Sequence, residues 1–297
     1  MHKVLDHIDR QLDKSLDLAT LAEVAHFSPF HFHRLFTAWM GETLGDYLRR
    51  RRVEVAAMRL SSQPRLPVLT AAISVGFGSG EAFARAFKTR FGCSPTAWRN
   101  QNRHRQGANR NPDQVKSNHD QVNLRFPFQH GVSRDTQPEI SMKVTLVDRV
   151  PAFVAYQRHT GPYGKPLSRF WQETMYPWLQ ENSLLEQARY GISHDDPSIT
   201  EPDRCRYDAC VEVPPNFTPA RSVLTATLPG GRYAVLRFKG TAAEIGEAWN
   251  SLLRDWLPSS GLQLDARPCF EYYPKDSSHD ARTGVFDCDI CIPVATL

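Results

Sequence analysis

The chain of 297 residues is too long for one ordinary hydrophobic core, so two domains are expected. Hydrophobic residues make up 41% and charged residues 23%, proportions that are typical of globular proteins and exclude a fibrous or disordered chain. Because no run approaches about eighteen apolar residues, no signal peptide opens the chain and six cysteines are too few for a disulfide framework, we expect no membrane span and a cytoplasmic location.

Positive charge is concentrated in the first third of the chain. Residues 1–105 contain 16 Lys and Arg against 9 Asp and Glu, whereas the remainder contains 20 against 23, so the net charge of +4 hides a basic part and a mildly acidic part. This asymmetry predicts that only the first part contacts a polyanion. A solvated basic face is the alternative interpretation.

The stretch from Ser28 to Phe36 has the pattern of the second, groove-entering helix of a helix-turn-helix. Ser28 is a favourable N-cap, and Pro29 suits the first helical position. Phe32 and Phe36 lie four residues apart and therefore share one buried face. Three candidates for contact with base edges fall outside this stripe: Phe30, His33 and Arg34.

The same pattern returns about fifty residues later, where Ser79 to Phe87 repeats the stretch above. A long amphipathic segment from Leu44 to Leu60 joins the two copies. It contains the run Arg49-Arg50-Arg51-Arg52, of which only part can face one phosphate strand because the run winds around a helix. Two copies joined by a helix predict an all-α double helix-turn-helix domain over residues 1–105.

Several motifs mark this region, namely Phe32-x-Arg34-x-Phe36, Val75-Gly76-Phe77, Phe83-x-Arg85-x-Phe87-Lys88 and Gly92-x-Ser94-Pro95-x-x-Trp98-Arg99. With these motifs, residues 4–103 resemble the AraC/XylS family of bacterial transcription regulators, which usually has tyrosine where Trp98 stands. The resemblance implies that one monomer places two recognition helices in successive major-groove segments of double-stranded DNA. RNA polymerase is a further candidate partner.

The family resemblance also implies which residues read bases. The base-reading positions match Phe30, His33 and Arg34 in the first unit, and Gly80, Glu81 and Arg85 in the second. Arginine can pair with guanine, glutamate can accept from cytosine N4, and phenylalanine can contact a thymine methyl group. Ser79 is interpreted as a helix cap whose backbone faces a phosphate. An internal salt bridge for Arg34 and a plain surface position for His33 are the alternatives.

Residues 106–140 are polar and aperiodic, which predicts a linker, interrupted by the apolar patch Leu124–Phe128. Residues 141–297 contain a second repeat, at a spacing near 79 residues. Each half has the pattern strand, helix, strand, strand. We therefore predict an α+β domain whose curved sheet carries both helices on one face and leaves a groove for a small molecule on the other.

This second part also carries recognisable motifs, among them His159-x-Gly161-Pro162-Tyr163, Gly230-Gly231-Arg232-Tyr233, Phe270-Glu271-x-Tyr273 and Cys291-Ile292-Pro293-Val294. Through them it resembles the effector-binding domain of the gyrase-inhibitor-like family. Following an AraC-type domain, this module is similar to the Rob-type arrangement. The resemblance implies a ligand-responsive regulator with Glu271 in its pocket.

The repeat gives an independent reason to single out Glu271. The equivalent position in the first half is near Gly191 or Ile192, neither of which is acidic. A buried carboxylate costs free energy unless it meets a cation or hydrogen-bond donors. Tyr273 shares its strand face, and an acid ringed by aromatic residues suits a small amphipathic or cationic effector. The alternative is that Glu271 has a capping role or pairs with a neighbouring arginine such as Arg267.

The next pocket candidates are Tyr156, Tyr163 and Trp171, although packing is the alternative role for the tryptophans. Cys288-x-x-Cys291 lies in a strand pattern that points the two thiols to opposite faces, so neither a metal nor another cofactor is expected. The favoured function is a sequence-specific DNA-binding transcription regulator that is not an enzyme. The alternatives are a hydrolase that uses Glu271 with Tyr156 or Tyr163, and a protein-binding module tethered to DNA.

Overall fold

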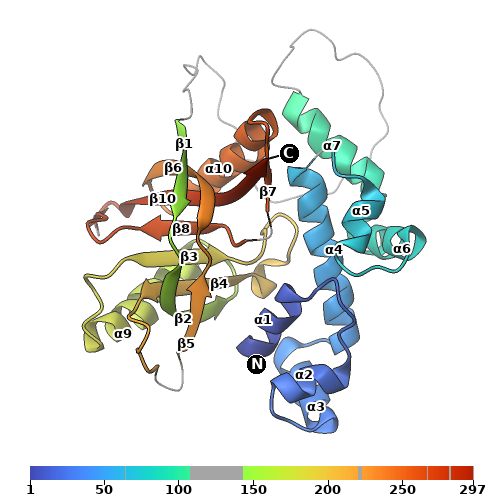
Figure 1. Cartoon of the computed structure of the whole chain (residues 1–297), viewed down its shortest axis with the longest axis horizontal. Helices are drawn as coiled ribbons and strands as arrows, with labels where there is room; N and C mark the ends of the chain where they lie inside the picture. Colours follow the sequence, from blue (N-terminus) through green and yellow to red (C-terminus); the bar gives the residue numbers. More distant parts are fainter. Residues whose placement is uncertain (64, 108–142, 220–222, 266, 281, 297) are drawn as a thin grey trace.

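The computed structural model describes residues 1–107 and 143–296, apart from residue 64, residues 220–222, residue 266 and residue 281. A helical N-terminal domain lies beside a C-terminal domain built around a curved sheet (Figure 1). The predicted linker, 106–140, falls almost entirely outside the described residues, and so does the apolar patch Leu124–Phe128. Among the described residues, no helix has the length and apolar character that crossing a membrane requires.

The helices of the N-terminal domain begin where the sequence predicts their caps. The Asp17 side chain accepts from the Thr20 amide, and the side chains of Ser28 and Ser79 likewise accept amide hydrogens three residues on. The helices are α1 (His2–Arg10), α2 (Leu18–Val24), α3 (Pro29–Met40), α4 (Leu44–Ser62), α5 (Val68–Ile73), α6 (Gly80–Phe91) and α7 (Pro95–Gly107).

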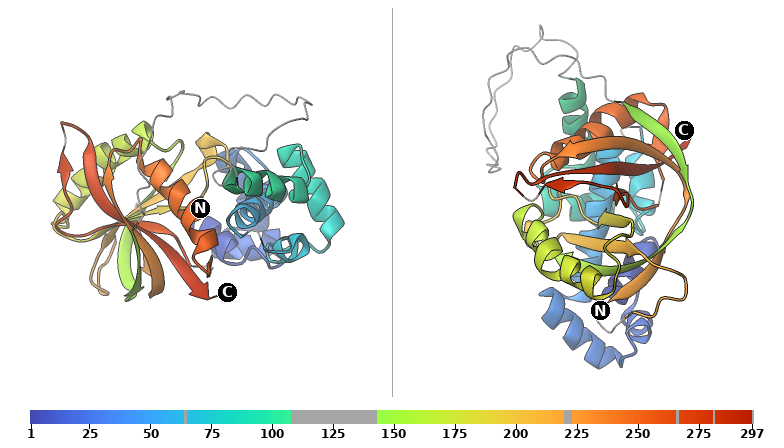
Figure 2. Two further views of the ribbon diagram at one scale, coloured as in Figure 1. Left: turned by 90° about the horizontal axis from the view of Figure 1, so that it is seen from above. Right: turned by 90° about the vertical axis from the view of Figure 1, so that its left-hand side faces the viewer.

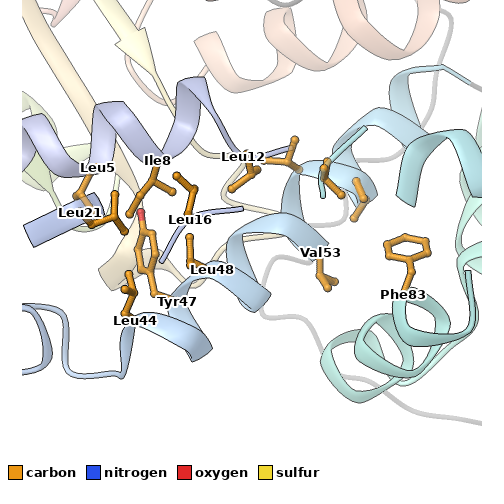
Figure 3. Close-up of a cluster of buried hydrophobic side chains, with 14 of the residues drawn as sticks. Leu5, Ile8, Leu12, Leu16, Leu21, Leu44, Tyr47, Leu48, Val53 and Phe83 are labelled. Atoms are coloured by element: carbon orange, nitrogen blue, oxygen red, sulfur yellow. The ribbon is translucent and has the colours of Figure 1, made fainter. Parts of the chain in front are cut away.

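Two helix-turn-helix units, α2–α3 and α5–α6, pack on the long helix α4. Phe32 and Phe36 of α3 and Phe83 and Phe87 of α6 are fully buried in one continuous core. Part of this core, from Leu5 of α1 to Phe83 of α6, is drawn in Figure 3. The turns of the two units also correspond, because His26 (φ 57°) and Gly76 (φ 89°) occupy the same left-handed conformation. The predicted double helix-turn-helix is therefore confirmed.

The C-terminal domain is an antiparallel sheet with helices. Its strands are β1 (Val144–Arg149), β2 (Ala152–Thr160), β3 (Arg189–Ser193), β4 (Arg206–Glu212), β5 (Leu224–Leu228), β6 (Gly231–Gly240), β7 (Leu262–Leu264), β8 (Phe270–Tyr273), β9 (His279–Asp280) and β10 (Val285–Thr296). Its helices are α8 (Lys165–Phe170), the π-helix η1 (Trp171–Met175), α9 (Tyr176–Glu181), η2 (Pro202–Arg204), α10 (Ile245–Asn250), the π-helix η3 (Ser251–Trp256) and η4 (Leu257–Ser259).

The strand order β1-β6-β10-β8-β3-β4-β2-β5 reflects the internal repeat. Within each half the chain runs strand, helix, strand, strand, as β2, α8–α9, β3 and β4, and then as β6, α10–η3, β8 and β10. The strand that precedes each half pairs with the other half, since β1 pairs with β6 and β5 pairs with β2. The short strands β7 and β9 both pair with β10. The two halves meet at β3 and β8, where Gly191 lies opposite Glu271. The predicted strand-helix-strand-strand repeats are confirmed.

Both helical segments cover the same face of the sheet (Figure 2). Over the first half, Met175 and Leu179 pack against Ala155, and over the second half Leu252 packs against Ile290. The other face holds a second apolar cluster that comprises Val154, Tyr156, Tyr190, Ile192, Cys210, Tyr233, Phe270 and Cys291, among others. Alternation along each strand assigns neighbouring residues to opposite faces.

Candidate functional site

The predicted base-reading side chains lie on the exposed surfaces of α3 and α6. Phe30 is 67% exposed, and His33, Arg34, Glu81 and Arg85 are also exposed. Both helices lie away from the sheet of the second domain (Figure 1). This arrangement leaves both helices accessible to a duplex.

The two arginines predicted to read bases form no ion pair among the described residues. In the described part of the chain, neither Arg34 nor Arg85 forms an ion pair, so the internal salt bridge considered for Arg34 is not observed. The Arg34 guanidinium carbon lies 5.8 Å from the centre of the Phe30 ring. A cation over an aromatic face is held in place without being neutralised.

The first residue of α6 is a glycine and has no side chain, which is a difference from α3. Ser79 Oγ accepts the Ala82 amide hydrogen at 3.2 Å, which is the capping role expected of it. Gly80 follows, and a Cβ there would lie 3.5 Å from Leu69 Cδ1, an ordinary contact distance. Because the Ser79 side chain caps the helix and Gly80 has none, Glu81 and Arg85 supply the remaining exposed polar side chains among the predicted positions of this unit.

The arginine run of α4 is mostly committed to internal contacts. Arg49 is exposed, with 65% of its side chain accessible. Arg50 pairs with two glutamates, Arg51 with two aspartates, and Arg52 donates to two backbone carbonyl oxygens. Three of the arginines that the composition assigned to a polyanion thus make contacts within the protein instead.

The carboxylate of Glu271 lies in the centre of the second domain and is 7% exposed. It accepts hydrogen bonds from Tyr207 Oη (3.0 Å), Tyr273 Oη (2.9 Å) and Trp249 Nε1 (3.1 Å). No Lys, Arg or His of the described residues pairs with it, and Arg267 pairs with Asp265 instead. Burial raises the pKa of Glu271 above its ordinary value, and the three donors only partly oppose that effect.

Gly191 creates the space that this group of side chains occupies. It faces Glu271 across the β3–β8 register. A Cβ at this position would lie 1.8 Å from Tyr207 Oη and 2.7 Å from Glu271 Oε2. The side chains of Glu271 and Tyr207 therefore leave room only for glycine at position 191.

Replacing Gly191 by alanine is expected to destabilise the domain by about 1–3 kcal/mol, the usual cost of overpacking a filled core. The new methyl group must displace Tyr207 or Glu271, because both lie closer than contact distance. Thermal unfolding with and without a hydrophobic cation measures the effect. Gly246→Ala is the matched control, since a Cβ there meets nothing within 4 Å; equal stability of the two variants would contradict the expectation.

The structure brings two further predicted residues to this site. The Trp171 ring centre lies 6.4 Å from that of Tyr207 and 6.3 Å from that of Tyr273. The Tyr163 ring centre lies 6.1 Å from that of Tyr207. Its hydroxyl, however, donates to the backbone carbonyl of Arg206 at 2.7 Å. Trp171 and Tyr163 therefore flank the acid without bonding to it.

Tyr156 is not part of this group. Its side chain belongs to the apolar cluster on the opposite face, and its hydroxyl donates to Asp6 Oδ2 of α1 at 2.8 Å. Alternation along β2 explains the difference, because Ala155 rather than Tyr156 points towards the helices. The structure thus places Tyr156 at the contact between the domains.

Two residues bonded to the acid were not among the predicted site residues, namely Trp249 and Tyr207. The repeat was the signal that could have found Trp249, since it occupies the place in the second half that Trp171 occupies in the first. The repeat also predicted the groove on the face without helices. That prediction was wrong for Glu271, which lies on the helix-covered face between the two helical segments.

The acid opens into a cavity of about 2060 Å³. This volume exceeds the roughly 300–1,000 Å³ of an ordinary ligand site, because its lining takes in residues from both faces of the sheet and from both domains. Its wall includes Trp171, Trp249 and Glu271 of the second domain and Met58 of α4. Glu271 therefore lines one part of a space that also reaches the N-terminal domain.

Comparison with known proteins finds a family match for each of the two domains. Residues 142–295 match the model of the GyrI-like small molecule binding domain, and residues 21–101 match that of a helix-turn-helix domain. The DNA gyrase inhibitor of Cronobacter sakazakii is 34% identical over 139 residues, which is 46% of this chain and 86% of that protein. The transcriptional regulator Rob of Salmonella typhimurium is 24% identical over 97% of this chain and 95% of its own length.

The right origin-binding protein of Escherichia coli K12 is 25% identical over 97% of this chain and 95% of its own length. Both domains thus recur in the same order in two longer relatives. The chain belongs to the GyrI-like family and is an AraC-type DNA-binding transcription regulator whose second domain is a GyrI-like small-molecule-binding domain.

Proposed function

We propose that the protein selects its DNA sites through the exposed side chains of α3 and α6 and binds an amphipathic cation beside Glu271. The observation that carries the effector assignment is a buried carboxylate with aromatic donors and no cationic partner among the described residues. A ligand cation supplies the missing charge, and Trp171 and Tyr273 supply aromatic faces for it.

For DNA, support comes from the equivalent places that Arg34 and Arg85 occupy on the two reading helices. Both arginines are exposed and unpaired among the described residues, so both can donate to guanine O6 and N7. Glu81 can accept from cytosine N4, Phe30 can contact a thymine methyl group, and His33 adds a donor or acceptor. The Ser79–Gly80 backbone at the start of α6 suits a phosphate.

We further propose that the protein acts by binding and not by catalysis. A hydrolase would need a tyrosine near Glu271 that gives up its proton readily. Burial raises the pKa of Tyr207 and of Tyr273 well above the ordinary value. Tyr163 is engaged with backbone carbonyls, and Tyr156 lies on the other face of the sheet. None of the four tyrosines is thus prepared for an acid–tyrosine mechanism.

Arg34→Ala is expected to weaken binding to the selected site by about 1–3 kcal/mol and to relax preference at one base position. Selection of bound duplexes from a random pool, followed by titration of the selected site and its single-base variants, measures both effects. Arg169→Ala removes the same charge from an exposed position in the second domain, where 72% of the side chain is accessible, and serves as the control. An equal loss on every sequence would make Arg34 a phosphate contact instead.

A further inference from the structure

Among the described residues, the segment from His194 to Arg206, which joins β3 to β4, makes most of the polar contacts between the two domains. We call it the clasp. It lies against α1 and α4 of the N-terminal domain and forms a buried centre and a more exposed rim. Its first residue follows β3, and its last residue begins β4.

The buried centre is a closed ring of four charges. Arg51 of α4 pairs with Asp9 of α1 at 2.8 Å and with Asp195 of the clasp at 2.5 Å. Arg206 pairs with the same two aspartates, both at 2.8 Å. Each charge therefore has two partners of opposite sign, one from its own domain and one from the other.

The rim connects the clasp to the end of each reading helix. Arg204 pairs with Glu42 at 2.5 Å, two residues beyond the end of α3. Glu201 pairs at 3.2 Å with Arg90, which lies in the last turn of α6. One segment of the effector domain thus holds both helix-turn-helix units.

The same segment continues into the acid site. Neighbouring residues on β4 point to opposite faces, so Arg206 joins the ring of charges while Tyr207 bonds Glu271 at 3.0 Å. Tyr163, which lies against Tyr207, donates to the carbonyls of Arg206 (2.7 Å) and Asp195 (3.2 Å). The effector acid and the contacts of both reading helices therefore share one short stretch of chain.

We propose that the clasp couples the two functions: a cation beside Glu271 shifts Tyr207 and the start of β4, and the rim pairs pass this shift to the ends of α3 and α6. This inference rests on the proposed function, because it requires an effector at Glu271. A bound cation competes with Tyr207 for the same carboxylate oxygen. A ligand can change a conformational equilibrium only when it interacts differently with the two states, and this competition supplies such a difference.

The rim offers a substitution that removes both rim ion pairs and leaves the buried ring of charges in place. In Glu201→Gln/Arg204→Gln, Glu42 keeps its pair with Arg50, and Arg90 keeps its pair with Glu54. No buried charge therefore loses its last partner. The control is Arg169→Gln/Glu173→Gln, which removes the same two residue types from an exposed pair within the second domain.

The test compares the dissociation constant for the selected duplex with and without saturating benzyltrimethylammonium. In the wild type and the control we expect a change of about 5–150-fold, the usual range of coupling between two sites. In Glu201→Gln/Arg204→Gln the change should fall below about twofold, while the probe still quenches tryptophan fluorescence. The same change in all three proteins, or no change in a wild type that binds the probe, would overturn the proposal.

A second measurement tests whether the clasp responds to DNA when no effector is present. Hydrogen exchange of residues 194–206 should respond to the duplex alone in the wild type and the control, and not in the rim variant. If the wild type fails to bind the probe, the effector assignment fails, but this second result still decides whether the clasp senses DNA. Exchange that is unaffected by DNA in the wild type would reject the coupling itself.

Discussion

Asp195→Asn is expected to lower the free energy of unfolding by about 3–5 kcal/mol, the cost of removing one partner from a buried ion pair. Arg51 and Arg206 are 7% and 3% exposed, and both depend on this carboxylate. After the substitution, the two guanidinium groups share the single charge of Asp9. Urea unfolding followed by tryptophan fluorescence measures the loss.

An exposed pair gives the matched comparison. Glu173→Gln removes a carboxylate whose side chain is 70% accessible and which lies 3.9 Å from Arg169. Exposed pairs contribute about 0.2–1 kcal/mol, so this variant should unfold almost as the wild type does. If Asp195→Asn cost no more than Glu173→Gln, the ring of charges would have no measurable role in holding the domains.

The difference in unfolding free energy between the wild type and Asp195→Asn should also depend on pH, and its direction follows from the pKa of Asp195. Burial alone would raise the pKa of Asp195, but the guanidinium groups of Arg51 and Arg206 outweigh it and lower that pKa to about 2. A carboxyl group with a lowered pKa contributes its full stability above its unfolded pKa, about 3.9, and loses it as the pH falls towards the folded value. The wild type and Asp195→Asn should therefore differ fully at neutral pH and converge in acid.

The reading helices could be predicted from sequence because their signals are local. Ser28 and Ser79 each cap the amide three residues on, and phenylalanines four residues apart must share a face. No such rule connects Arg51 with Asp195, which are 144 residues apart and meet only because the domains dock. Composition treated Arg51 as a positive charge available to DNA, although the folded protein buries it between two aspartates.

The site around Glu271 was partly predictable, because an acidic residue that occurs in only one half of a repeat stands out when the two halves are compared. The repeat aligned Glu271 with Gly191 or Ile192, and Gly191 is also its cross-strand neighbour in the β3–β8 register. Symmetry could also have added Trp249, the counterpart of Trp171, to the site. Tyr207 is harder to foresee, since its counterpart Phe286 lacks a hydroxyl group and the bond to Glu271 exists only across the seam between the halves.

Glu271→Gln is expected to weaken binding of benzyltrimethylammonium by about 2–5 kcal/mol, which is about thirtyfold or more in the dissociation constant. The glutamine keeps the shape of the side chain, and its amide oxygen can still accept from Tyr207 and Tyr273, while its NH2 group takes the position that now accepts from Trp249 Nε1. The loss therefore reports the charge together with that one hydrogen bond. Quenching of tryptophan fluorescence measures it, because Trp171 and Trp249 flank the acid.

Neopentylbenzene, in which carbon replaces the charged nitrogen, separates charge from shape. It should bind the wild type and Glu271→Gln with similar affinity, because apolar contact with the aromatic walls does not require a carboxylate. A parallel loss of both probes would mean that the substitution had changed the shape of the cavity. An unchanged affinity for the cation would remove Glu271 from the effector site.

The pH dependence of the same titration follows from the raised pKa of Glu271, whose main cause is burial. The cation binds the ionised carboxylate, so wild-type affinity should rise as the pH passes upward through that pKa, while Glu271→Gln should show no such rise. Without ligand the sign reverses: a raised pKa stabilises the fold below the unfolded value, and this stability is lost as the pH rises. The ionised Glu271 carboxylate therefore binds a cation best in the same pH range in which the ligand-free fold is less stable.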